Sequence, residues 1–428
     1  MLDELSLQKT QSRMFIIVFF TWFLCMLGYL ISYIFAGGIT SIPLFGSING
    51  DQFGDMFAYI NTTLAKNGLH NVYVLNRDVS IYPPFSFIVL RGFMQFLPDH
   101  DGYHSQYTDM LILLYSAACM LVLAYLFYVN AKNQKERNRL FFLVFAFSSG
   151  PFLFLLERGN LLLLTLVFTA FFLFYYKSEH AALRELALIA LAMAANLKIY
   201  PALLGLMLLH DRNWKGTARC VFYGIVLFVG PFLFIGGYEQ FQMFLRNVQF
   251  AVSELQGTNV VAATLLNFSN TIAVVTSFFG GTAEAGFAIA KYLQIPLLLL
   301  VPVAVYFIKE DWKVALLLVL VMILIPNFNW YYSACFYLIP LFLFLNRAHT
   351  HRIDYFYIVF MCGALLPVTF LNSLISNPYR LNADFAASGY LCNICGLLLV
   401  CTFLFDFARN CKTRWETIRQ NHKKPTIS

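Results

Sequence analysis

Residues 107–130 read YTDMLILLYSAACMLVLAYLFYVN and contain one charged side chain, Asp109. An α-helix of this length measures about 36 Å, which is enough to cross the roughly 30 Å hydrocarbon core of a bilayer. The stretch therefore predicts a membrane-spanning helix. Similar apolar runs occur along most of the chain.

The composition supports the same prediction. Of the 428 residues, 60% are hydrophobic, 18% aromatic and 12% charged, whereas a typical soluble domain is about 45–50% apolar and about 25% charged. These values exclude a water-soluble globule and a disordered chain. We expect an all-α polytopic membrane protein in which residues 1–428 form a single integral membrane domain.

Hydropathy predicts about twelve spans, three of which are short for a straight crossing. Short spans are typical of broken or partial helices, and the three are 182–197, 199–210 and 314–326. The other predicted spans are 14–36, 107–130, 140–156, 160–176, 217–236, 287–308, 330–346, 355–372 and 386–406.

The basic residues indicate how these spans are oriented. With the N-terminus in the cytoplasm, 21 of the 29 Lys and Arg residues lie inside and 8 outside, whereas the acidic residues divide evenly. This is the bias of multi-pass proteins, so the net charge of +7 indicates topology and not nucleic-acid binding. We expect a cell-membrane protein with both termini cytoplasmic, a basic cytoplasmic tail at 407–428, and outer loops at 37–106 and 237–286.

The first outer loop carries two aspartates, Asp51 and Asp55, at helical spacing. A period of three or four residues predicts an amphipathic surface helix here; its apolar positions are Phe53, Phe57, Ile60 and Leu64. Like charges four residues apart repel by a few tenths of a kcal/mol, which favours a functional reason for the pair. Either aspartate could instead cap the helix, and the sequence leaves both interpretations open.

Charged residues also interrupt the apolar helices at their predicted outer ends. Glu157, Arg158 and Asn160 lie in one turn, and a second turn holds Lys198 two residues before Tyr200. Ionisable groups at the edge of a bundle cost several kcal/mol unless paired, so they are functional candidates by default. The alternatives are an ion pair of Glu157 with Lys198 or Arg158, and snorkelling toward the lipid headgroups.

Further positive charge faces outward at Arg246, in the second outer loop, and at Arg380. With Arg158 and Lys198 these residues would form a ring of cations at the outer headgroup level, which suits a lipid phosphate. Aromatic residues lie at the end of a neighbouring short span: Trp330, Tyr331 and Tyr332. The pattern predicts a site for a lipid-linked substrate.

No metal centre or redox site is predicted. Cys392 and Cys395 form a CxxC inside an apolar helix without a second pair, which favours a structural role. His100 and His104, with Asp101 between them, come nearest to a ligand cluster. A solvated loop is the better interpretation of these three residues.

In their order along the chain, several motifs resemble those of the GT-C class of membrane glycosyltransferases and, within it, glycosyltransferase family 87. These motifs are Gly54-Asp55 followed by Tyr59, Tyr82-Pro83-Pro84, the Arg158-Gly159-x-Leu turn with Asn160, and Lys198-x-Tyr200-Pro201. The resemblance implies a GT-C-like bundle of about twelve transmembrane helices, with two outer loops that carry amphipathic surface helices.

Known members of this family are largely polyprenyl-phosphate-mannose-dependent mannosyltransferases. The resemblance therefore implies inverting transfer of a hexose, such as mannose, from a polyprenyl-phosphate sugar to a lipid-linked or cell-envelope glycan at the outer face. It implies that Asp55 is the general base, with Asp51 as the second catalytic candidate. The donor phosphate is expected to contact Arg158, Asn160, Lys198, Tyr200, Arg246 and Arg380, and the sugar or acceptor to contact Tyr59, Tyr82, Trp330 and Tyr331. Neither a cofactor nor a nucleic-acid partner is expected, and membrane lipids surround the protein.

Two other functions remain alternatives. A lipid or solute transporter predicts inverted repeats and ionisable residues near the bilayer midplane, and the sequence shows neither. A polysaccharide polymerase would also use outward cations. Its substrate distinguishes it, because a polymerase acts on lipid pyrophosphate-linked repeats and the transferase on a lipid monophosphate sugar.

Overall fold

The computed structural model describes residues 14–24, 26, 27, 30, 34, 53–64, 68–75, 81–95, 106–131, 134–257, 265–326, 329–347, 351–368 and 386–423. Over these residues the fold is helical, and the β-structure amounts to one isolated antiparallel bridge between Leu265 and Trp330. The all-α prediction is therefore confirmed. With η for a 3-10 helix, the elements after the helix Met14–Leu24 are α2 (Gly54–Leu64), η1 (Gly68–Asn71), α3 (Val72–Leu75), α4 (Pro84–Met94), α5 (Gln106–Asn130), α6 (Glu136–Phe147), α7 (Gly150–Arg158), α8 (Leu162–Tyr175), α9 (Ala181–Leu197), η2 (Tyr200–Gly205), α10 (Leu206–His210), α11 (Trp214–Val229), α12 (Phe232–Ile235), α13 (Gly237–Gly257), α14 (Phe268–Phe278), α15 (Ala283–Phe307), α16 (Asp311–Leu324), η3 (Tyr331–Tyr337), α17 (Leu338–Leu345), α18 (Asp354–Ala364) and α19 (Ala386–Lys423).

Several helices are able to cross a membrane by length and composition. The four that are long enough alone are Tyr107–Asn130, Trp214–Ile235, Ala283–Phe307 and Ala387–Asn410. A fifth crossing results if α6 and α7, which are bent by 54° at a short break, act as one broken span. The chain is thus a membrane protein with four or five such helices in its described part, and the count of about twelve spans stays a prediction.

The remaining predicted spans are shorter helices. The segments at 199–210 and 330–346 begin as the 3-10 helices η2 and η3 before they continue as α-helix. The helices α9 and α16 have 17 and 14 residues, or about 26 and 21 Å at 1.5 Å per residue. Both are shorter than a bilayer core of about 30 Å.

The helix α16 lies at the centre of the bundle. It is apolar after its first turn, and every residue from Trp312 to Leu324 is buried. A helix that is hydrophobic all round belongs in such a position. At its start, the buried Lys313 ammonium lies 2.7 Å from the Asp406 carboxylate of α19, which ties the two helices together.

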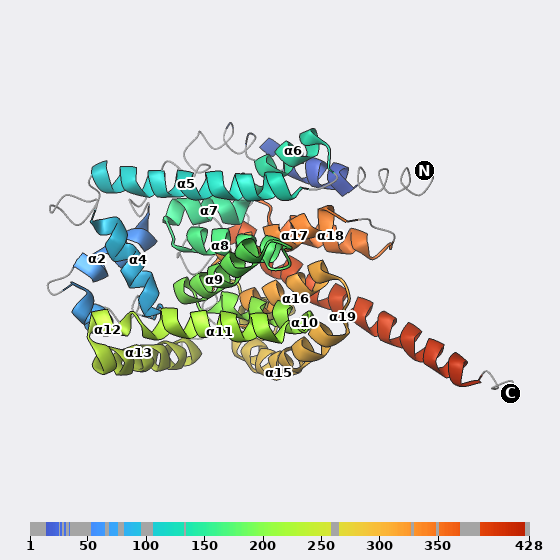
Figure 1. Ribbon diagram of the computed structural model, residues 1–428. Helices are drawn as coiled ribbons and strands as arrows, with labels where there is room; N and C mark the ends of the chain where they lie inside the picture. Colours follow the sequence, from blue (N-terminus) through green and yellow to red (C-terminus); the bar gives the residue numbers. More distant parts are fainter. Residues whose placement is uncertain are drawn as a thin grey trace.

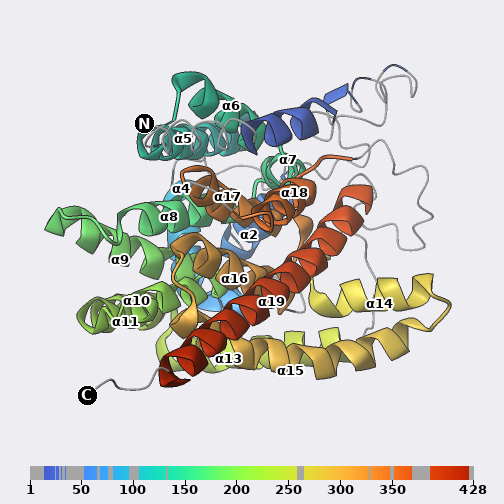
Figure 2. The same cartoon turned by 90° about the vertical axis from the view of Figure 1, so that its right-hand side faces the viewer.

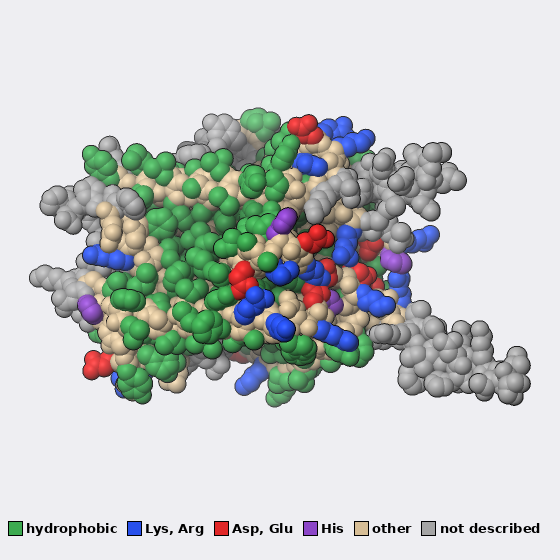
Figure 3. Space-filling model, viewed as in Figure 1, with side chains coloured by type: hydrophobic (Ala, Val, Ile, Leu, Met, Phe, Trp, Pro, Cys, Tyr) green, Lys and Arg blue, Asp and Glu red, His purple; other side chains and the backbone are tan. Residues whose placement is uncertain are grey.

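Other helices expose their apolar faces. The faces of α11 and α15 are lined with exposed large hydrophobic residues such as Phe222, Ile225, Tyr292 and Leu299. In the space-filling view, hydrophobic side chains cover much of this face, and most of the charged ones gather on the half away from α2 and α4 (Figure 3). Exposed apolar surface of this extent suits a lipid environment.

Helices from both predicted outer loops gather at one end of the bundle. Figure 1 shows α2 and α4 beside α12 and α13 at this end, while α19 extends from the opposite end. The view in Figure 2 shows α19 crossing the bundle diagonally, with α14 and α15 on one side of it. The predicted basic tail is continuous with the last span, because α19 runs unbroken to Lys423. That the loop helices lie on a membrane surface stays a prediction.

Candidate active site

Asp55 lies in the first turn of α2, as the sequence pattern predicted. The backbone just before it is anchored to another helix, because the Phe53 N–H donates to the Glu157 carbonyl oxygen at 2.8 Å. That carbonyl belongs to the last turn of α7, where helix carbonyls lack partners within the helix. Phe53 adopts a positive φ of 58° to make this connection. The start of α2 is therefore fixed against the end of α7.

The Asp55 carboxylate is held by two residues of the turn after α7. Arg158 approaches Oδ1 with Nη2 at 2.8 Å and Nε at 3.0 Å, and Asn160 donates to Oδ2 with Nδ2 at 2.5 Å. The side chains of Arg158 and Asp55 are 12% and 21% exposed, so the pair is largely shielded from water. The sequence left an ion pair of Arg158 with Glu157 open as an alternative, and the structure places the Arg158 guanidinium on Asp55.

Gly159 shapes the turn that carries these two residues. It ends α7 with a left-handed φ of 59°, a conformation that glycine adopts without steric cost. A Cβ atom here would also lie only 3.2 Å from side-chain carbons of Ile112 and Phe53. The glycine thus allows α2 and α5 to pack directly against the turn.

Asn160 connects the carboxylate to the aromatic part of the site. It is fully buried, and its Oδ1 accepts the Leu162 N–H at 2.8 Å. This contact assigns the amide nitrogen to the opposite side, where Nδ2 faces both Asp55 and the Tyr59 hydroxyl, the latter at 3.3 Å. The side chain is therefore held in one orientation by the first turn of α8.

A chain of hydroxyl groups continues from Tyr59 to Lys198. The Tyr59 hydroxyl donates to the Tyr82 hydroxyl at 2.5 Å, and the Lys198 ammonium donates to the same Tyr82 oxygen at 2.6 Å. Burial raises the pKa of the Tyr59 phenol well above its usual value, and the nearby Tyr82 and Asp55 raise it further. Tyr59 thus remains a neutral link between a carboxylate and a cation.

The residues around Tyr82 and Lys198 fix their backbones. Pro84 is the first residue of α4, where a proline suits a helix start because the missing N–H needs no partner. The Tyr73 hydroxyl donates to the Tyr82 carbonyl at 2.9 Å. The Ser86 hydroxyl donates to the Leu197 carbonyl at 2.9 Å, which joins α4 to the end of α9 next to Lys198.

Lys198 is a buried cation that has no carboxylate partner among the described residues. Its residue is 9% exposed, and in the described part of the chain no carboxylate lies within 4.0 Å of its Nζ. Aromatic faces and one hydroxyl surround the ammonium instead, with Nζ 4.4 Å from the centroid of the Tyr82 ring and 5.7 Å from that of Tyr332. Such contacts recover about 0.5–2 kcal/mol, less than the several kcal/mol that burial of an unpaired ion costs. An anionic ligand would complete this site.

Not every predicted residue joins the cluster. Arg246 is exposed on α13 and contacts Met243 there. Tyr331 is buried elsewhere, with its hydroxyl donating to the Leu366 carbonyl at 3.2 Å. Tyr200 packs edge-on against Phe336 and borders the cluster, because its phenol lies near those of Tyr82 and Tyr332. Asp51, Arg380 and the His100, Asp101 and His104 cluster lie outside the described residues.

Tyr332 was not among the residues that the sequence predicted to contact the substrate. It faces Lys198, whereas its neighbour Tyr331 faces away. Trp330, also predicted for the site, forms the isolated bridge with Leu265. In the described part of the chain, the three side chains best placed to hold a metal are His210, Asp211 and Asp311. They lie beyond the far end of α8, and the predicted absence of a metal stays a prediction.

Comparison with known proteins identifies the family. The family model described as glycosyltransferase family 87 matches residues 81–328, which is more than half of the chain. The chain therefore belongs to this family and is a glycosyltransferase. The matched range includes Tyr82, Arg158, Asn160 and Lys198, whereas Asp55 precedes it. No curated protein and no solved structure matches the chain.

Proposed function

We propose that this member of family 87 transfers a hexose, mannose in the first instance, from a polyprenyl-phosphate sugar to a lipid-linked or cell-envelope glycan. The transfer inverts the anomeric centre and takes place at the outer face of the cell membrane. The observation that carries the proposal is the buried Lys198 ammonium, which has aromatic rings beside it but no carboxylate within 4.0 Å among the described residues. A lipid monophosphate would supply the missing negative charge.

The contact between Arg158 and Asp55 supports a binding order in which the donor binds before the acceptor. In the unliganded site the Arg158 guanidinium contacts Oδ1 of Asp55 through Nη2 and Nε, so this oxygen is already occupied and is not open to an acceptor hydroxyl. A donor phosphate bound to Lys198 would compete for the same guanidinium. Movement of Arg158 to the phosphate would release Oδ1 of Asp55, while Asn160 keeps Oδ2 in place. Donor binding would thus expose the general base before the acceptor arrives.

The chemical step then proceeds by direct displacement. The acceptor hydroxyl oxygen forms a bond to the anomeric carbon while the bond from that carbon to the phosphate oxygen breaks. Asp55 takes the hydroxyl proton. The polyprenyl phosphate leaves with the electron pair, and Lys198 and Arg158 stabilise its growing negative charge.

Reporter fusions that measure membrane topology test whether the site lies on the outer side of the membrane. Because Asp55 belongs to the first predicted outer loop, we expect reporters fused after residue 75 or residue 260 to be active only as extracytoplasmic reporters. A reporter fused after residue 423, at the end of α19, serves as the cytoplasmic control. Cytoplasmic activity at residue 75 would contradict the proposed side of catalysis.

The donor class is tested directly with purified protein. We expect transfer from polyprenyl-phosphate mannose into a cell-envelope lipid extract, and no transfer from nucleotide sugars, since the proposed site binds one lipid phosphate. Polyprenyl-phosphate glucose, galactose and arabinose serve as matched donors that differ only in the sugar. Activity only with an oligosaccharide pyrophosphate lipid would contradict the proposal and favour a polymerase.

A further inference from the structure

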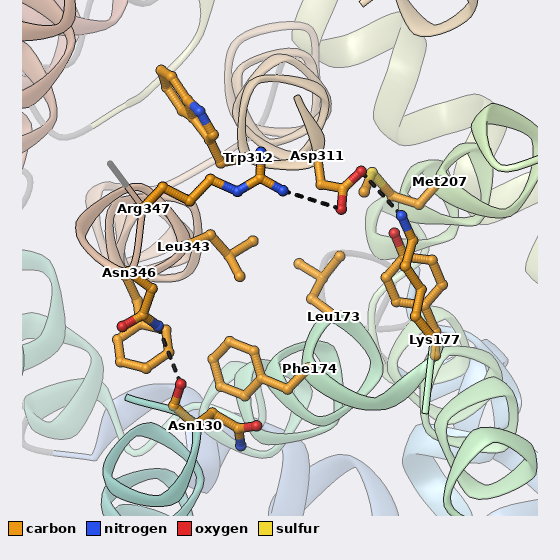
Figure 4. Close-up of a pocket in the computed structure, with 12 residues that line it drawn as sticks. Asn130, Leu173, Phe174, Lys177, Met207, Asp311, Trp312, Leu343, Asn346 and Arg347 are labelled. Atoms are coloured by element: carbon orange, nitrogen blue, oxygen red, sulfur yellow. Dashed lines mark hydrogen bonds and ion pairs between the residues drawn. The ribbon is translucent and has the colours of Figure 1, made fainter. Parts of the chain in front are cut away.

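A cavity lies at the end of the bundle away from Asp55. It has a volume of about 340 Å³ and is enclosed by the ends of α8 and α17 and the start of α16. Figure 4 shows an open space between Leu173, Phe174 and Leu343, with charged side chains along one edge. Because α8 begins beside Asn160 and has 14 residues, its length of about 21 Å separates this cavity from the proposed active site.

The charged edge of this cavity is balanced. The Lys177 ammonium lies 3.0 Å from Asp311 and 2.8 Å from Asp211, and the Arg347 guanidinium lies 3.6 Å from the other oxygen of Asp311. A purely anionic or cationic ligand would leave one of these four charges without its partner. A ligand that carries both a cation and an anion keeps every charge paired.

His210 adds an acceptor beside Asp311. Its Nδ1 lies 2.6 Å from the Val305 carbonyl oxygen, and because a carbonyl can only accept, Nδ1 carries the proton. In the neutral ring Nε2 then offers its lone pair, and this atom lies 3.8 Å from Asp311. Together, the carboxylate and the imidazole nitrogen form a pair of acceptors that suits a ligand ammonium with several N–H groups.

Tyr176 provides a hydroxyl donor at the wall of the cavity, close to Asp211. The residue is 4% exposed and lines the cavity, and its hydroxyl forms no hydrogen bond with any described residue. A buried hydroxyl that forms no hydrogen bond is unfavourable, because it has lost its contact with water and gained none in return. The Lys177 ammonium lies 5.3 Å from the centre of the Tyr176 ring, on the same edge of the cavity. A ligand oxygen here would satisfy the hydroxyl.

We infer that this cavity binds the headgroup of a phospholipid with a primary amine, of the phosphoethanolamine type. The ligand phosphate would accept from Arg347 and Tyr176, and its ammonium would donate to Asp311 and His210. Lys177 would keep Asp211 as its partner when the ammonium takes its place at Asp311. A lipid is the favoured source because the cavity opens at helix ends of a membrane protein, where headgroups lie.

Headgroup preference tests this inference. We expect purified protein in nanodiscs to bind phosphatidylethanolamine roughly tenfold more tightly than phosphatidylcholine, whose quaternary ammonium has no N–H to donate, as measured by native mass spectrometry. Phosphatidylglycerol, which has the phosphate but no amine, should also bind less tightly. Equal binding of all three lipids, or the tightest binding of phosphatidylglycerol, would overturn the inference.

A mild substitution separates the headgroup site from general effects on folding. Tyr176→Phe removes a hydroxyl that forms no hydrogen bond within 3.5 Å to any described residue, so we expect the unliganded melting temperature to remain nearly unchanged and the preference for phosphatidylethanolamine to fall several-fold. Lys215→Gln, at an exposed lysine outside the cavity, should leave the preference intact. Soluble phosphoethanolamine at millimolar concentration should compete weakly. If it binds as tightly as the lipid, or if Tyr176→Phe leaves the preference unchanged, the lipid site is wrong.

Discussion

Asp55→Asn should lower the rate of sugar transfer by roughly 10²-fold or more, because asparagine cannot take the acceptor proton and general-base catalysis contributes about that much. The free energy of unfolding should also fall, by about 1–3 kcal/mol, because the substitution removes the ion pair between Asp55 and Arg158 in a shielded position. Transfer assays with purified protein, together with thermal or denaturant unfolding, measure the two effects separately.

Donor affinity distinguishes a catalytic role of Asp55 from a structural one. In Asp55→Asn the guanidinium of Arg158 no longer contacts the Asp55 carboxylate, so we expect the polyprenyl-phosphate donor to bind as tightly as to the wild type, or more tightly. A purely structural role predicts that donor binding and transfer are lost together. Transfer within tenfold of the wild-type rate would contradict the assignment of the base.

The chain offers a matched control for the broken ion pair. Asp406 pairs with Lys313 at 2.7 Å, and both side chains are buried at the start of α16. Asp406→Asn should therefore cost at least as much stability as Asp55→Asn while leaving transfer measurable below its melting temperature. Loss of transfer in both variants at such a temperature would show that broken ion pairs, and not the missing base, abolish activity.

Local periodicity predicted much of this site. The three- to four-residue spacing placed Asp55 at the start of a helix, and α2 begins at Gly54. The interrupted apolar runs placed Arg158 and Lys198 at helix ends, and the structure has α7 ending at Arg158 and α9 ending one residue before Lys198. These features depend on neighbouring residues along the chain, so a single sequence contains them.

The sequence could not predict which aromatic side chain near residue 331 faces the site. Tyr331 was predicted for the site and Tyr332 was not, yet Tyr332 faces Lys198. Both lie in the 3-10 helix η3, where successive side chains point about 120° apart at three residues per turn. Which one faces the cluster depends on the rotation of η3 against its neighbours, and this rotation is set by tertiary packing.

The sequence also could not predict which carboxylate pairs with Arg158. Glu157 is adjacent to Arg158 and was an obvious partner for a nearby cation, but Arg158 contacts Asp55, which is about a hundred residues away along the chain. The left-handed Gly159 and the hydrogen bond from Phe53 to Glu157 bring the two elements together. Similarly, hydropathy identified apolar segments, but it did not show which of them continue as one helix and which break into 3-10 and α parts.

Lys198→Met should make the unliganded protein more stable while it weakens donor binding. Burial of an ion costs several kcal/mol, and in the described part of the chain no carboxylate within 4.0 Å of Lys198 offsets this cost. After subtraction of the cation–π contacts with Tyr82 and Tyr332, we expect a gain of about 1 kcal/mol. The donor dissociation constant should rise roughly tenfold or more, because a charge-assisted contact to the phosphate disappears.

A second buried lysine provides the comparison that decides between a ligand site and an internal ion pair. Lys313 is 5% exposed and pairs with Asp406, so Lys313→Met should destabilise the protein by about 3–5 kcal/mol through the carboxylate that it leaves unpaired. Donor affinity should not change in this variant, since Lys313 lies at the start of α16 and not beside Asp55. Opposite signs of the stability change for the two lysines, measured by denaturant unfolding, would support a phosphate as the natural partner of Lys198. If Lys198→Met destabilises the protein as Lys313→Met does, and donor affinity is unchanged, then Lys198 serves an internal ion pair and the phosphate assignment is wrong.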